Sequence, residues 1–217
     1  MNHLIAPSIL AADFANLQRD VEMMNNSQAD WMHIDIMDGM FVPNISFGFP
    51  VMKAVKKYAT KPLDVHLMIV DPDRYLKAFA DAGAYSITVH YETCPHLHRT
   101  VQAIKELGCK ASVAINPHTN TLLLKDIIAD LDMVLVMSVN PGFGAQKFIE
   151  HTYTKITEVK EMSALTNPHL NVEVDGGVDI SNISRLMAAG ANVFVAGNSV
   201  FSAANQTEAI AQLKNAK

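Results

Sequence analysis

Cysteine and charge are both scarce in this 217-residue chain. Its two cysteines, Cys94 and Cys109, form no Cys-x-x-Cys pair, which predicts free thiols in a reducing compartment and disfavours a disulfide framework. Charged residues make up 18% of the chain and the formal net charge is −5. The sequence therefore lacks the basic surface expected of a protein that binds nucleic acid or acidic membranes.

Long hydrophobic segments are missing as well. The longest apolar runs, such as residues 133–137, have the length of a strand and fall far short of a membrane span. The first ten residues lack the charged start and long apolar core of a signal peptide. Apolar residues still make up 49% of the chain, which is enough for one sizeable core. We therefore expect a globular, cytoplasmic protein.

Short apolar runs alternate with segments of helical period along the whole chain. Segment 72–83 begins with proline and ends with glycine, as helices often do. The pattern predicts eight strands, each followed by a helix, at 4–10, 31–37, 63–69, 86–91, 110–116, 133–139, 171–176 and 193–199. No Gly-x-Gly-x-x-Gly motif follows the first strand, so an α/β fold of the closed (β/α)8 TIM-barrel type is favoured over an open sheet. We expect one domain over residues 1–217.

Polar side chains fall on the strand faces that should point into this barrel. On the second predicted strand, Met32, Ile34 and Ile36 form a wholly apolar face that suits the helix layer, so the alternate residues point inward. The same rule on the third and seventh strands completes a set of inward polar residues: His33, Asp35, His66, Glu173 and Asp175. Because burying an unpaired charge costs free energy, the presence of these polar residues inside the barrel requires a structural or functional explanation.

Two histidines and two aspartates of this set fall near the carboxyl ends of their strands, where barrel active sites lie. Imidazole and carboxylate groups suit one divalent ion such as Zn²⁺, Fe²⁺, Mn²⁺ or Co²⁺. The second and seventh strands face each other across a barrel, so Asp35 and Asp175 would flank a ligand from opposite sides. Metal chelation of a carbonyl acidifies the neighbouring proton; one carboxylate can remove it and the other can return one, which is an epimerisation.

The other histidines are expected to lie outside this site. His90 faces inward on the fourth predicted strand and is interpreted as a core residue. Five more are predicted at the surface: His3, His96, His98, His151 and His169.

Glycines follow the last three predicted strands: Gly142, Gly144, Gly176, Gly177 and Gly197. In TIM barrels the loops after strands seven and eight commonly hold phosphate, and glycine lets backbone N–H groups approach an anion closely. The long segment after the sixth strand carries NPGFGAQKF, which is predicted to close over a bound substrate.

These motifs resemble the ribulose-phosphate 3-epimerase family. The resemblance runs in order through APSILAADFANL, HIDIMDGMFVPNISFG, DVHLM, VMSVNPGFGAQKF, VEVDGGV and AGNSVF. It implies conversion of D-ribulose 5-phosphate to D-xylulose 5-phosphate in the pentose phosphate pathway. It also implies a metal site at His33, Asp35, His66 and Asp175, with Asp35 and Asp175 as the acid–base pair. The implied substrate contacts are Ser8, His66, Met37, Met68, Met137, Gly142, Phe143, Gly144, Ala145, Gly176, Gly177, Gly197 and Asn198.

Three positions depart from the family pattern. Ala145 stands where glycine is usual, Phe49 replaces a frequent histidine, and Asn198 replaces a common serine. Barrels of this size often associate, so a homo-oligomer is expected. Other functions stay open from the sequence: an epimerase of allulose 6-phosphate, a metal-dependent hydrolase, and a sugar-phosphate-binding barrel with a structural metal and no activity.

Overall fold

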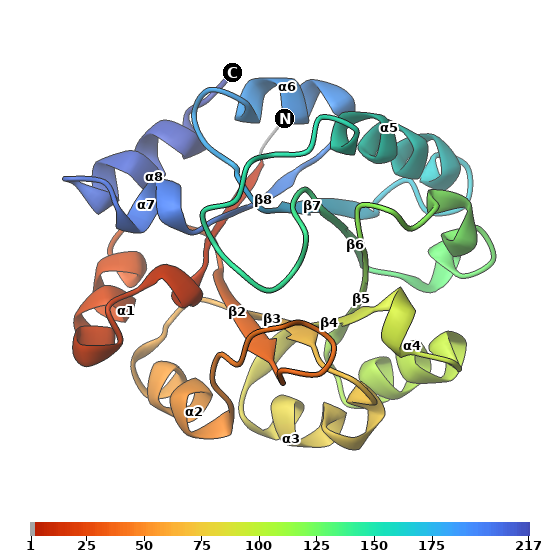
Figure 1. Ribbon diagram of the computed structural model, residues 1–217, viewed down its shortest axis with the longest axis horizontal. Coiled ribbons are helices and arrows are strands. Elements are labelled where there is room, and N and C mark those ends of the chain that lie inside the picture. The colour runs from red at the N-terminus through yellow and green to blue at the C-terminus, as the bar shows by residue number, and fades with distance from the viewer. Residues whose placement is uncertain (1–2) are drawn as a thin grey trace.

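The computed structural model describes residues 3–217, which form a nearly closed barrel of eight parallel strands (Figure 1). The strands are β1 Leu4–Pro7, β2 Met32–Met37, β3 Leu63–Met68, β4 Ala84–His90, β5 Lys110–Ile115, β6 Met133–Met137, β7 Asn171–Asp175 and β8 Val193–Ala196. The predicted TIM barrel is confirmed, with strand ends that differ from the predicted ones by up to three residues. The first strand stops early because Ser8 caps the short 3₁₀ helix η1 at Ile9–Ala11.

The strands pair in the order β1-β8-β7-β6-β5-β4-β3-β2. A single parallel bridge between Ser8 and His33 joins β1 to β2 across the remaining seam. The register pairs Asp35 of β2 with His66 of β3, and Met137 of β6 with Asp175 of β7. Strand pairing therefore brings the polar residues of distant segments to the same end of the barrel.

Helices surround the barrel on its outside (Figure 1). The α-helices are α1 Leu17–Asn25, α2 Phe49–Tyr58, α3 Leu76–Asp81, α4 Leu97–Glu106, α5 Thr152–Ser163, α6 Ile183–Ala189, α7 Asn198–Phe201 and α8 Gln206–Lys214. Further 3₁₀ turns are η2 Phe14–Asn16, η3 Pro72–Arg74, η4 Tyr91–Thr93, η5 Thr121–Leu124 and η6 Ile128–Asp130. Valine, isoleucine and leucine on the outer face of each strand pack against this helix layer and are almost completely buried.

The prediction of a helix after the fifth strand is wrong. The segment between β5 and β6 forms only the 3₁₀ turns η5 and η6. Its buried side chains Thr121, Leu124 and Ile127 recur every third residue, which matches the three residues per turn of a 3₁₀ helix.

One histidine predicted at the surface is buried. His3 is only 5% exposed, because α8 packs against β1 and offers the Leu213 carbonyl oxygen at 2.9 Å from His3 Nε2. The other four predicted surface histidines are exposed. Cys94 and Cys109 are free, as expected, and both are buried. Within residues 3–217, every helix is too short or too polar to span a membrane.

Candidate active site

The predicted cluster begins on β2, where His33 and Asp35 point into the barrel and are 0% and 3% exposed. The Nδ1 atom of His33 lies 2.7 Å from Asp64 Oδ2, and its Nε2 atom lies 3.2 Å from Asp35 Oδ1. Asp35 also accepts a hydrogen bond from Ser8 Oγ at 2.5 Å. Side chains from both sides of the barrel seam therefore hold the carboxylate of Asp35.

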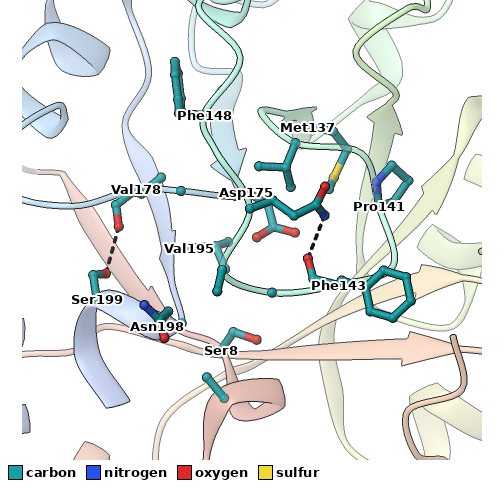
Figure 2. Close-up of a pocket in the computed structure, with 18 of the residues that line it drawn as sticks. Ser8, Met137, Pro141, Phe143, Phe148, Asp175, Val178, Val195, Asn198 and Ser199 are labelled. Carbon is teal, nitrogen blue, oxygen red and sulfur yellow. Dashed lines mark hydrogen bonds between the residues drawn. The ribbon is translucent and has the colours of Figure 1, made fainter. Parts of the chain in front are cut away.

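Two more strands complete the cluster. The Nδ1 atom of His66, on β3, lies 3.2 Å from Asp35 Oδ1 and 3.6 Å from Asp175 Oδ2. Asp175 reaches this point from β7, and its carboxylate points into the cavity above the barrel (Figure 2). One nitrogen or oxygen atom of each of four residues falls within 4.8 Å of the others: His33, Asp35, His66 and Asp175. The fold thus brings together the four side chains that the alternation pattern selected.

The two aspartates differ in their electrostatic surroundings. Burial alone would raise the pKa of Asp35, but the charges and hydrogen bonds of His33 and His66 outweigh burial and hold that pKa well below its usual range. Burial, reinforced by the charge of Asp35, raises the pKa of Asp175 to about 7. Near neutral pH the chain therefore sets an ionised carboxylate beside one that can carry a proton, the arrangement of an acid–base pair.

A second cluster, of two acidic side chains and a histidine, lies deeper in the barrel and consists of Asp64, Glu173 and His33. Asp64 Oδ1 accepts a hydrogen bond from Ser86 Oγ at 2.5 Å, and Glu173 is fully buried. Burial, and then the charge of Asp64, raise the pKa of Glu173 well above its usual value. The sequence reasoning placed Glu173 inward but missed Asp64, although Asp64 shares its strand face with His66.

The surroundings of His33 show whether a cation fits this cluster. In the neutral ring, Asp64 Oδ2 accepts from the Nδ1 atom of His33, which leaves Nε2 with a lone pair; this Nε2 atom is buried and has no hydrogen-bond partner among the described residues. Burial would lower the pKa of His33, yet the charges of Asp35 and Asp64 raise it well above its usual value. Positive charge is therefore favoured at this point. Imidazole nitrogen and carboxylate oxygen are donors that Zn²⁺ and similar ions take, so the residues fit a divalent ion.

A cavity of about 750 Å³ opens over the cluster at the carboxyl ends of the strands. Asp35 and Asp175 line it, whereas His33 and His66 are fully buried and do not. Twelve of the expected substrate contacts also line it: Ser8, Met37, Met68, Met137, Gly142, Phe143, Gly144, Ala145, Gly176, Gly177, Gly197 and Asn198. Phe49 lies elsewhere, packed against Phe79 with ring centroids 4.5 Å apart.

The loop between β6 and α5 lies over the mouth of the barrel (Figure 1). Asn44 Nδ2 donates to the Gly142 carbonyl oxygen at 2.7 Å and ties the loop to the segment after β2. Gln146 Nε2 donates to the Phe143 carbonyl oxygen at 2.8 Å within the loop (Figure 2). Ala145 has a φ of +57°, a conformation that favours glycine, so the departure from glycine at this position carries backbone strain.

The loops after β7 and β8 close the other side of the cavity. Gly176 and Gly177 have φ angles of +114° and +62°. Asn198 begins α7, whose first N–H groups have no acceptor inside the helix. Ser199 Oγ donates to the Val178 carbonyl oxygen at 2.8 Å and joins the two loops (Figure 2). Backbone N–H groups and the Asn198 amide thus gather at one edge of the cavity, which suits an anionic group.

His90 is buried as predicted, yet it is not an isolated core residue. Its Nε2 atom lies 2.8 Å from His66 Nε2, and its Nδ1 atom lies 3.2 Å from Glu92 Oε2. Sequence reasoning missed Glu92 because this residue follows the end of β4 in η4, where strand alternation no longer applies.

A TIM barrel with an opposed acid–base pair beside a cation-compatible cluster is the framework of an enzyme that acts on a small molecule in the cavity at the carboxyl ends of its strands. Solved structures agree on the fold. KGPDC from Streptococcus mutans superposes with a TM-score of 0.74 at 14% identity, covering 99% of this chain and 97% of that one. A mutant tryptophan synthase α-subunit from Pyrococcus furiosus gives a TM-score of 0.70 at 18% identity, with 98% and 95% covered.

Sequence comparison is more specific than fold. The model of the ribulose-phosphate 3 epimerase family matches residues 4–201. Ribulose-phosphate 3-epimerase of Bacillus subtilis is 50% identical over 214 residues, which cover 98% of this chain and 99% of that protein. The enzyme of the same name from Escherichia coli K12 is 44% identical, with 98% and 95% covered, and the chloroplastic one from Arabidopsis thaliana is 45% identical, with 99% and 77% covered. The chain belongs to the ribulose-phosphate 3-epimerase family and is an enzyme of the isomerase class.

Proposed function

We propose that this enzyme interconverts D-ribulose 5-phosphate and D-xylulose 5-phosphate, a step of the pentose phosphate pathway, by inverting carbon 3. The observation that carries the proposal is the pair Asp35 and Asp175, which line one cavity from opposite strands and differ in protonation. A structural neighbour, KGPDC from Streptococcus mutans solved with a bound sugar phosphate, supports a ligand of this class in a barrel of this kind.

The two aspartates move the proton. Asp35, ionised at neutral pH, takes the carbon-3 proton of one epimer and leaves an enediolate of the substrate. Asp175, which can carry a proton because its pKa is raised to about 7, delivers one to the opposite face. In the reverse direction the two carboxyl groups exchange these tasks. The hydrogen bond from Ser8 Oγ to Asp35 Oδ2 orients the first carboxylate during both steps.

His33, Asp35, His66 and Asp175 would hold one divalent ion, whose charge stabilises the developing oxyanion of the substrate when it is bound. His33 would contribute Nε2 and His66 would contribute Nδ1, the ring atoms that face Asp35. The identity of the ion, self-association and a cytoplasmic location stay predictions from the sequence.

Other residues bind the substrate and exclude water. The loops that carry Gly177, Gly197 and Asn198 receive the phosphate, while the thioethers of Met37 and Met68 form an apolar wall around the reacting carbon. The loop with Phe143 and Gly144 closes over the substrate and shields the enediolate, which can otherwise lose phosphate. Amide hydrogen exchange at residues 142–146 should slow when a substrate analogue saturates the enzyme; unchanged exchange contradicts the lid.

The decisive experiment follows xylulose 5-phosphate formation from ribulose 5-phosphate in heavy water, with metal content measured on the same sample. The proposal expects solvent deuterium at carbon 3 of the product and a loss of activity on exhaustive chelation. Product that retains its original carbon-3 hydrogen after a single turnover would overturn the two-base mechanism. The same assay with D-allulose 6-phosphate decides between the pentose and the hexose substrate.

Asp35→Asn and Asp175→Asn should each lower epimerisation by roughly two to four orders of magnitude, the usual weight of a positioned acid or base. Asp81→Asn, at an exposed ion pair on α3, is the matched control and should keep full activity. Because both cluster aspartates also face the proposed ion, only variants that retain metal test proton transfer. Wild-type rates in either metal-loaded variant refute the assignment of that carboxylate.

A further inference from the structure

A line of buried side chains leads from the proposed metal site to the end of β4. His66 Nε2 lies 2.8 Å from His90 Nε2, and His90 Nδ1 lies 3.2 Å from Glu92 Oε2. Both imidazoles are 0% exposed, and Phe41 covers His90 with ring centroids 4.6 Å apart. Both ring nitrogens of His90 and the Nε2 atom of His66 therefore each face one specific protein group.

Glu92 is held so that only one of its oxygens faces His90. Its Oε1 atom accepts hydrogen bonds from the Asn116 backbone N–H at 2.9 Å and from Thr119 Oγ1. The buried Lys155 donates to the Asn116 carbonyl oxygen at 2.5 Å and anchors the same segment. The Oε2 atom is left to face the imidazole of His90.

While both imidazoles are neutral, hydrogen-bond donors and acceptors along this line can alternate in two ways, one starting from Glu92 and the reverse one starting from Asp35, whose Oδ1 atom lies 3.2 Å from His66 Nδ1. Asp35 Oδ1 also faces His33 Nε2 at 3.2 Å, whereas Glu92 Oε2 faces His90, which favours the alternation that starts from Glu92. A carboxylate only accepts, so the Nδ1 atom of His90 carries the hydrogen and its Nε2 atom has the lone pair. That lone pair faces His66 Nε2, which must then carry a hydrogen. The Nδ1 atom of His66 is left with its lone pair, pointing at Asp35 Oδ1 and Asp175 Oδ2.

We infer that Glu92, acting through His90, is a positioning residue that sets the tautomer of His66 and so presents its Nδ1 lone pair to the metal site. The inference rests on the proposed metal site, where His66 is one of the four candidate ligands. His33 also has a carboxylate behind it, but without a second histidine in between, because Asp64 accepts directly from its Nδ1 atom. A ligating histidine needs such a partner at its other nitrogen to fix its tautomer.

Glu92→Gln reverses this alternation with almost no change of shape. The Asn116 N–H and the Thr119 hydroxyl require an acceptor, so the amide oxygen takes the position of Oε1 and the amide NH₂ turns to His90. His90 must then accept at Nδ1 and donate from Nε2. His66 accepts at Nε2 and carries its hydrogen on Nδ1, where the ion would bind.

The test compares zinc affinity in wild type, Glu92→Gln and the control Thr119→Val, by competition of Zn²⁺ with a chelator. Thr119→Val removes a hydrogen bond to the same carboxylate but leaves the charge that faces His90. We expect Glu92→Gln to raise the dissociation constant of Zn²⁺ by about 10–100-fold, the usual effect of losing a partner behind a ligand. Thr119→Val should stay close to wild type. Equal affinities of the two variants, both folded by circular dichroism, overturn the inference.

A second measurement needs no variant. Nitrogen-15 NMR of the histidine rings in the metal-free wild type at alkaline pH, with both imidazoles neutral, should show hydrogen on Nε2 of His66 and on Nδ1 of His90. The opposite tautomer of either ring overturns the inference even if Glu92→Gln does not fold. This readout also separates the two proposals: wild type that binds no Zn²⁺ while it shows the expected tautomers contradicts the metal site alone.

Discussion

Gly176 is the position where one added methyl group should do the most damage to this barrel. Its φ of +114° is a conformation that residues with a Cβ rarely adopt. A Cβ built there would lie 2.4 Å from Cγ2 and 2.8 Å from Cγ1 of Val139. Val139 is only 5% exposed and its β-branched side chain has little rotamer freedom, so it cannot move aside cheaply.

The cost of Gly176→Ala can be built from these two observations. The left-handed conformation costs about 1–2 kcal/mol for a residue with a Cβ. Overpacking a buried side chain costs about 1–3 kcal/mol more. We therefore expect Gly176→Ala to lower the free energy of unfolding by about 2–5 kcal/mol.

Urea unfolding followed by circular dichroism measures this loss, with Gly144→Ala as the control for stability. A Cβ on Gly144 meets nothing within 4 Å, and its φ is not positive, so this control should change stability by no more than about 0.5 kcal/mol. If the free energies of unfolding of the two variants differ by less than about 1 kcal/mol, Val139 moves aside for the new methyl group and the steric argument is wrong.

Four further predictions concern charge, strain and reactivity. Zinc affinity should already decline at pH values above 6.5, the usual pKa of a histidine side chain, because the raised pKa of His33 lets a proton compete with the ion; a dissociation constant that stays flat as the pH falls to 6.5 contradicts it. Burial lowers the pKa of Lys155 to about 8 from 10.5. The unfolded chain therefore binds more protons between these values, so the free energy of unfolding should rise with pH there in wild type but not in Lys155→Met, as titrated urea unfolding will test. Ala145→Gly relieves the strain at φ +57° and should stabilise the protein by about 0.5–1 kcal/mol in the same assay; a loss of stability speaks against strain. Cys94, whose pKa burial raises to about 11, should resist iodoacetamide in the native protein and react after unfolding, and rapid native alkylation would contradict its burial.

The metal cluster could be predicted because it depends on a local rule. Alternation along a strand determines which side chains point into a parallel barrel, and this was enough to select His33, His66 and Asp175. The rule requires no knowledge of loops or helices. The same rule could also have identified Asp64, because Asp64 lies two residues before His66 on the same strand face.

What the alternation rule leaves out depends on contacts between distant segments. Glu92 meets His90 only because η4 turns it back over the end of β4, and Asn116 from the end of β5 then fixes its orientation. His3 is buried by α8, which lies at the other end of the chain. The hydrogen-bond partners of a side chain, as opposed to its direction, are therefore hard to predict from a strand pattern.

The first and last strands of the barrel pair with each other beside its seam. β1 pairs with β8 over four residue pairs, whereas its pairing toward β2 consists of one bridge, between Ser8 and His33. During synthesis, β1 emerges first and its main partner strand emerges last. A nascent chain that extends as far as β6 already carries three of the four clustered side chains but lacks Asp175. The cluster therefore becomes complete only after β7 has emerged, and the first strand gains its neighbour only once β8 has followed.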